Sequence, residues 1–225
     1  MLFMNKAQIS EVVLNTEQQN SLINLLPSIK THEEEDMIGL MHVVGFILQK
    51  TVFDSISNKQ IIENFKHGKT HALLVRNFPI EKQLPLTPTT GFCPLASIAL
   101  SAQISFGMMG ALNINPVTYR GENDDKVVRH VVPRIDGDNE ISSHGSKLAF
   151  DFHVDNPDLP LVSEESCALS PCPEYLSLHS IRYDHNVPTK LLFLDDVIKE
   201  CAKETIEVLS EPIFIIKEAC FIYRY

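Results

Sequence analysis

The chain has 225 residues, of which 44% are hydrophobic, 21% charged and 8% aromatic, and it contains no Trp. These values fit a globular protein and exclude a small disulfide scaffold, a disordered tail, a collagen-like chain and a coiled coil. The formal charge is −10, from 19 basic and 29 acidic residues, and the basic residues are scattered. Nucleic-acid binding and docking on anionic lipid are therefore disfavoured.

The cysteines and the apolar stretches indicate a cytoplasmic protein. The five cysteines are an odd number and form no Cys-x-x-Cys pair, so free thiols in a reducing compartment fit best. The first six residues lack the long apolar region of a signal peptide. The longest apolar stretch, 39–48, is interrupted by His42 and is too short to span a bilayer.

The first 70 residues are predicted to be helical. A helix capped by Thr16 ends near Pro27, and a second helix begins in the acidic run 33–36, where carboxylates complement the helix dipole. Its apolar residues follow helical spacing as far as Leu48 and predict a core-facing stripe. A third helix is expected over 58–66, ending before Gly68.

From residue 71 onward the pattern changes to strands with helices between them. A buried strand is expected over 71–75, a proline-fixed loop over 84–88 and an Ala- and Leu-rich helix over 94–112. Further strands are expected at 117–119, 127–132, 147–154, 175–183 and 213–216, with a helix from Asp195 or Asp196 to Leu209. A parallel βαβ series does not fit this order, and no linker divides the chain, so one α+β domain over 1–225 is predicted.

The most informative short motif is His153-Val-Asp155. On a strand, residues i and i+2 point to the same face, so this imidazole and carboxylate can enter one cavity. They would supply two ligands of the 2-His-1-carboxylate triad that holds Fe(II) and leaves open positions. The spacing alone also allows a partly buried histidine hydrogen-bonded at a strand end, and His32-x-Glu34 has the same pattern in a helix-start region.

Four segments, in order, carry a resemblance to a known family. They are His71-Ala-Leu-Leu-Val-Arg-Asn-Phe-Pro79, Leu84-Pro-Leu-Thr-Pro88, Val131-Val-Pro133 with Phe152-His-Val-Asp155, and Cys172-Pro-Glu-Tyr-Leu-Ser-Leu-His-Ser-Ile-Arg182 with Pro188-Thr189. From about residue 71 to 214 the chain resembles the clavaminate synthase-like branch of the taurine dioxygenase superfamily, which consists of Fe(II)/2-oxoglutarate oxygenases. The order and spacing of the segments are more specific than any one of them.

The resemblance implies a double-stranded β-helix, or jelly roll, over 71–225, with inserted helices and the helical segment 1–70 in front of it. It also implies that His153 and Asp155 bind the metal and that Thr189 hydrogen-bonds the 2-oxoglutarate carboxylate, although Thr189 could equally cap the segment after a strand. Asp155 stands where this branch usually has Glu. Residues 161–170 resemble an insertion that could lie over the active site and shape substrate choice.

The family's second metal-binding His and its 2-oxoglutarate-binding Arg have no clear counterpart. After Leu209 there is no His, and Arg224 is the only Arg there and comes too early. His179 could face the cavity from its predicted strand or be an ordinary polar residue, and His185 is expected in an exposed turn. We therefore expect a barrel incomplete at its C-terminal end, from a truncated chain, a split gene, or an assembly in which a partner chain or homo-oligomer completes it.

Three functions are compatible with these patterns. The first is an Fe(II)/2-oxoglutarate oxygenase that hydroxylates an aliphatic carbon of a free amino acid or related small molecule. The second is a metal-free family member or fragment that acts by binding or oligomerising. The third, ranked last, is a different metalloenzyme or a cupin-like protein that uses His179 with His153 and Asp155.

Overall fold

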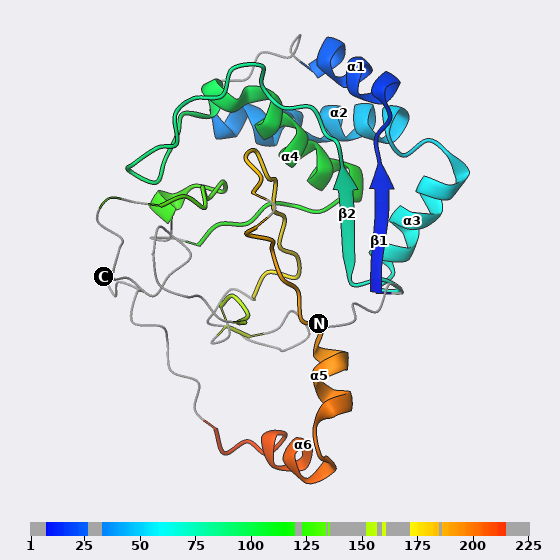
Figure 1. Ribbon diagram of the computed structural model, residues 1–225, viewed down its shortest axis with the longest axis vertical. Coiled ribbons are helices and arrows are strands. Elements are labelled where there is room, and N and C mark those ends of the chain that lie inside the picture. The colour runs from blue at the N-terminus through cyan, green and yellow to red at the C-terminus, as the bar shows by residue number, and fades with distance from the viewer. Residues whose placement is uncertain are drawn as a thin grey trace.

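Across the residues that it describes, the computed structural model combines helices with a small two-stranded sheet (Figure 1). It describes residues 8–26, 33–119, 123–133, 135, 152–156, 159–160, 172–184 and 186–214. The elements in chain order are β1 (Ile9–Val13), α1 (Thr16–Leu25), α2 (Glu34–Thr51), α3 (Ile56–Lys66), β2 (Ala72–Arg76), η3 (Leu95–Ile98), α4 (Ala99–Leu112), η4 (Asn123–Asp125), α5 (Leu194–Glu200) and α6 (Lys203–Leu209).

The two strands form a parallel pair in which Ile9 lies opposite Ala72 and Val13 lies opposite Arg76. The connection between them runs through α1, α2 and α3, as parallel pairing requires a long crossover. β2 confirms the strand expected near 71–75, whereas β1 was not predicted. The sequence predicted no parallel βαβ series, and the described strands form only this one parallel pair. β1 was missed because it buries only Val12 and has no clear hydrophobic pattern.

The predicted helices of the N-terminal region are present, with small changes at their ends. Asn15, not Thr16, caps α1: its side chain accepts from the Gln18 backbone, and Gln18 reaches back to the Asn15 N–H. α2 begins in the acidic run, as expected. α3 begins two residues before the predicted start because Ser55 caps it.

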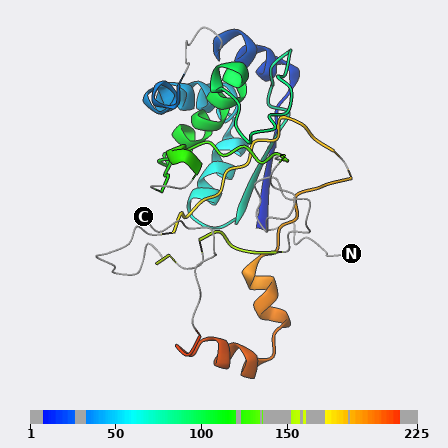
Figure 2. The same ribbon diagram turned by 90° about the vertical axis from the view of Figure 1, so that its left-hand side faces the viewer.

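Helices α2 and α4 pack with their backbones in direct contact. A Cβ added to Gly110 would lie 2.1 Å from the Met41 carbonyl oxygen, and one added to Gly45 would lie 2.5 Å from the Gly110 carbonyl carbon. Side chains from both helices then build the core, including the fully buried Leu48, Ile104 and Phe106. Figures 1 and 2 show the result as layers, with α4 between α2 and the two strands.

The window Leu95–Leu112, which joins η3 and α4, is long and apolar enough to cross a membrane by length and composition. This helical stretch is longer than the apolar run at 39–48 on which the sequence prediction was based. Half of it is buried inside the protein, and it packs on α2. The core helix of a globular domain meets the same criterion, so the stretch is weak support for a membrane span.

The segment after α4 is held by a carboxylate rather than by a sheet. The two oxygens of Glu34, in the first turn of α2, accept from the backbone N–H groups of Val127 and Val128 at 2.9 and 3.0 Å. Val127 and Val128 pack against the core cluster that contains Met37. The strands expected at 117–119 and 127–132 are not formed, although all of these residues are described.

The C-terminal region is more open than the rest. The helix expected to run to Leu209 is divided at Cys201 and Ala202 into α5 and α6, neither of which has a buried residue, and both extend away from the layered body (Figure 1). Residues 175–183 form no strand, nor do the described parts of the strands expected at 147–154 and 213–216. The structure is mixed helix and strand, and the jelly roll stays a prediction.

The close approach of the two helices gives a first prediction. Gly110→Ala should lower the free energy of unfolding by about 1–3 kcal/mol or more, because backbone atoms of Met41 occupy the space of the new methyl group. Urea unfolding in dilute solution measures this change. Gly39→Ala is the matched control, since no atom of the described residues lies within 4 Å of its added Cβ; in a solution dilute enough to keep the chain monomeric it should cost nothing. Equal losses in both variants would contradict the packing.

The contact of Glu34 gives a second prediction. Glu34→Ala should cost about 1–3 kcal/mol because two partly buried N–H groups lose a charged acceptor. Glu34→Gln keeps one acceptor oxygen at the same reach and should lose less than the alanine variant. Hydrogen exchange of the Val127 and Val128 amides should accelerate in the same order. Unchanged exchange in Glu34→Ala would show that this contact does not hold the segment.

Candidate functional site

His153 and Asp155 lie side by side, as their spacing predicts. The His153 Nε2 is 3.6 Å from the Asp155 Oδ1, and the side chains are 43% and 57% exposed. They belong to the irregular segment 152–156 and not to a strand, so the expected strand face is not what brings them together. Both functional groups can be reached from solvent.

Cys172, which lies 17 positions after Asp155, contacts the backbone beside this pair. The Cys172 thiol donates to the backbone carbonyl of Asp155 at 3.6 Å, and the Cys172 N–H donates to the Pro160 carbonyl at 2.7 Å. These contacts join positions that are distant in sequence, and nothing in the sequence pattern pointed to them. The cysteine count predicts Cys172 only as a free thiol, whereas its sulfur contacts the backbone of the site.

No third metal ligand joins the pair within the described ranges. Those residues contain no group of three or more His, Cys, Asp or Glu side chains placed to hold a metal ion. His185 and residues 161–170 lie outside the described residues. Thr189 is exposed in the segment before α5, and its predicted contact with 2-oxoglutarate remains a prediction.

His179, the alternative third ligand, takes part in a different contact. Its ring stacks on Phe78, with centroids 6.3 Å apart and planes inclined by 22°. Burial lowers the pKa of His179 below its usual value, and the negative charge of Glu81 opposes this shift. The stacking and the lowered pKa describe a neutral imidazole packed beside the residues that follow β2.

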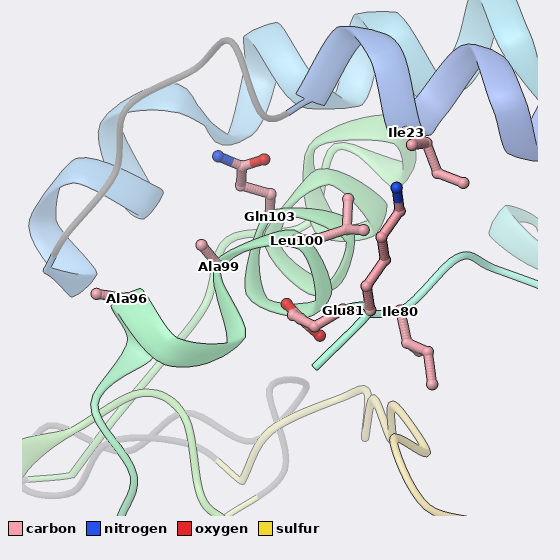
Figure 3. Close-up of a pocket in the computed structure, with 8 residues that line it drawn as sticks. Ile23, Ile80, Glu81, Ala96, Ala99, Leu100 and Gln103 are labelled. Carbon is pink, nitrogen blue, oxygen red and sulfur yellow. The ribbon is translucent and has the colours of Figure 1, made fainter. Parts of the chain in front are cut away.

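A cavity of about 470 Å³ lies between α1, the segment after β2 and the start of α4 (Figure 3). Its walls are mainly apolar, and Glu81 is its acidic group. The Glu81 carboxylate already accepts from the Ser101 N–H at 2.9 Å and from the Ser101 hydroxyl at 2.6 Å. It therefore satisfies the first turn of α4, where unpaired N–H groups favour a carboxylate.

The described geometry thus offers one imidazole and one carboxylate that can contact the same cation. Fe(II) and similar ions accept this pair of donors, and two protein ligands leave positions for further groups. A scan against protein-family models, a search of curated proteins and a search of solved structures found no match to the chain. The function proposed for the chain therefore rests on its own sequence and on the residues of the site.

The lowered pKa of His179 gives a third prediction. Because the unfolded chain takes up the proton more readily, this residue's contribution to stability is complete above about pH 6.5 and falls as the pH decreases. Urea midpoints at about pH 7.5 and 5.5 should therefore differ less in His179→Gln than in the wild type. His130, whose pKa burial also lowers, leaves a residual slope in the variant. An unchanged slope would contradict the assignment to His179.

Proposed function

We propose that the protein is an Fe(II)/2-oxoglutarate-dependent oxygenase that hydroxylates an aliphatic carbon of a free amino acid or related small molecule. The observation that carries the proposal is the pair His153 and Asp155 within the ordered series of motifs that resembles this family. The absence of a Lys/Arg cluster argues against a nucleic-acid substrate. The odd number of cysteines, with no Cys-x-x-Cys pair among them, favours a cytoplasmic location.

The geometry of the pair is compatible with one metal ion. Metal–nitrogen and metal–oxygen bonds of about 2.1 Å allow two ligand atoms to be up to about 4.2 Å apart, and the two atoms here are 3.6 Å apart. An imidazole and a carboxylate are donors that Fe(II) accepts in oxygenases. The residues therefore fit two of the three protein ligands that the family uses.

The roles proposed for the chain's own residues follow from these donors. His153 binds through its neutral imidazole and Asp155 through its carboxylate, so both must be deprotonated when the metal enters. Thr189 donates its hydroxyl hydrogen to a carboxylate oxygen of 2-oxoglutarate and orients it. Bound iron would supply the oxidation of the substrate carbon with oxygen and 2-oxoglutarate, while the protein would bind and orient the substrate.

A non-catalytic member that acts by binding or oligomerising is the second candidate. Two observations favour it: the described residues contain no third ligand beside the pair, and the segment 172–214 exposes many large apolar side chains. Leu176, Leu178 and Ile213, for example, are 72%, 59% and 69% exposed. A partner chain that completes a barrel would cover such residues.

The fourth prediction separates the candidates. Under anaerobic conditions the wild type with Fe(II) and 2-oxoglutarate should develop the weak visible absorption band of the iron chelate and, after oxygen is admitted, form succinate. His153→Ala and Asp155→Asn should weaken metal binding by more than about tenfold, because the first removes the imidazole nitrogen and the second replaces a charged carboxylate with a neutral amide. Asp155→Glu keeps the carboxylate that the family branch commonly uses and should keep the band.

Binding of Mn²⁺, followed by its electron paramagnetic resonance signal, reports on the pair without any turnover. If wild type and Asp155→Asn bind Mn²⁺ equally and neither forms the band or succinate, the oxygenase proposal is wrong. The non-catalytic candidate then stands. Circular dichroism of every variant shows whether the fold has been kept.

A further inference from the structure

The exposed face of α2 has a pattern that its own fold does not explain. Met37, Met41, Val44 and Leu48 cover the buried side of the helix. On the opposite side, Val43 and Phe46 remain 51% and 59% exposed. Figure 2 shows that α2 is an outer layer, with α4 on one side of it and the strands beyond α4.

The residues along the centre of this face follow the spacing of a helix–helix seam. Glu35, Gly39, His42 and Phe46 are separated by four, three and four positions, and all are exposed. Such spacing keeps one stripe of a helix facing a neighbouring helix over its whole length. Lys50 borders the last turn of the stripe and holds its ammonium 5.7 Å from the centre of the Phe46 ring.

This stripe is complementary to itself when a second copy runs in the opposite direction. With a two-fold axis near His42, Phe46 of one copy lies over Gly39 of the other, and Lys50 lies opposite Glu35. A large ring then meets a position without a side chain, and none of the described residues comes within 4 Å of a Cβ built at Gly39. An acidic helix end likewise meets a basic one.

Gly39 is the feature that argues most directly for a second helix. A glycine inside a helix costs stability relative to alanine, and its backbone here needs no positive φ. Gly45, Gly107 and Gly110 are each explained by close contact within the chain, whereas Gly39 faces outward. Small residues of this kind allow two helices to approach closely, which Phe46 requires if it is to be covered.

We propose that α2 forms the interface of a symmetric homodimer, in which two copies pack antiparallel through Glu35, Gly39, His42, Phe46 and Lys50. The interface is isologous, so each contact occurs twice. It uses no residue of the candidate metal site. The dimer and the oxygenase proposal can therefore fail independently of each other.

Sedimentation equilibrium of the full chain over about 1–100 µM tests the proposal. The wild type should be a dimer in this range, and Phe46→Glu should raise the dissociation constant by about 100-fold or more, because it buries a charge at the centre of the interface. Phe214→Glu is the matched control, since Phe214 is the same residue with 56% exposure, and it should leave the dimer intact. Gly39→Leu should also weaken the dimer while circular dichroism shows an unchanged helix content.

A charge exchange fixes the direction of the helices. Lys50→Glu should weaken the dimer by about tenfold through repulsion with Glu35 of the second copy, and adding Glu35→Lys in the same chain should restore it. A wild type that stays monomeric at the highest concentration would overturn the proposal. So would a dimer unaffected by Phe46→Glu and Gly39→Leu, or a double variant that dimerises no better than Lys50→Glu.

Discussion

The contact between the backbones of α2 and α4 is the constraint on which the described structure depends. Gly45 and Gly110 remove the side chains that would separate the helices, so the flanking residues of both can enter one core. That core places the end of β2 and the start of α4 close enough for Glu81 to reach Ser101. It also places the first turn of α2 where Glu34 meets the segment after α4.

The N-terminal body and the C-terminal segments differ in how much of each is buried. The body has a continuous core, whereas α5 and α6 have no buried residue. The segments after residue 172 contact the body mainly through single side chains: His179 on Phe78, Tyr175 on Phe65, Phe193 on His71 and Arg182 on the Pro85 carbonyl. Because each contact is small and partly exposed, this region opens more readily than the helical core.

Sequence patterns predicted the features that depend on neighbours in the chain. The stripe from Met37 to Leu48 and the helix after Pro94 were predicted because helical periodicity is local. Ser55 and Asn15 moved helix ends by a few residues only. The pair His153 and Asp155 was also predicted, since two positions i and i+2 stay close in almost any extended conformation.

Features that depend on distant partners could not be predicted in the same way. β1 is a strand because residues 72–76 pair with it. Its own sequence gave no clear strand signal, because Val12 is its single buried residue. Apolar residues at 127–132 indicate a capacity to form a strand, but a strand forms only beside a partner, and Glu34 takes up two of these N–H groups. The close contact of Gly110 with Met41 and the contact of Cys172 with Asp155 likewise join residues that are distant in sequence, so neither could be predicted.

The parallel register of the sheet also imposes an order on synthesis. Ile9 pairs with Ala72, 63 positions later, and at about 5–20 residues per second the ribosome needs about 3–13 s to make the partner of β1. α4 is made later still, so the buried stripe of α2 is complete before the helix that covers it exists. Until α4 has been made, Met37, Met41 and Leu48 of the nascent chain lack the helix that covers them. Chaperones that bind short apolar helices would meet the apolar stripe of α2 before α4 is available to cover it.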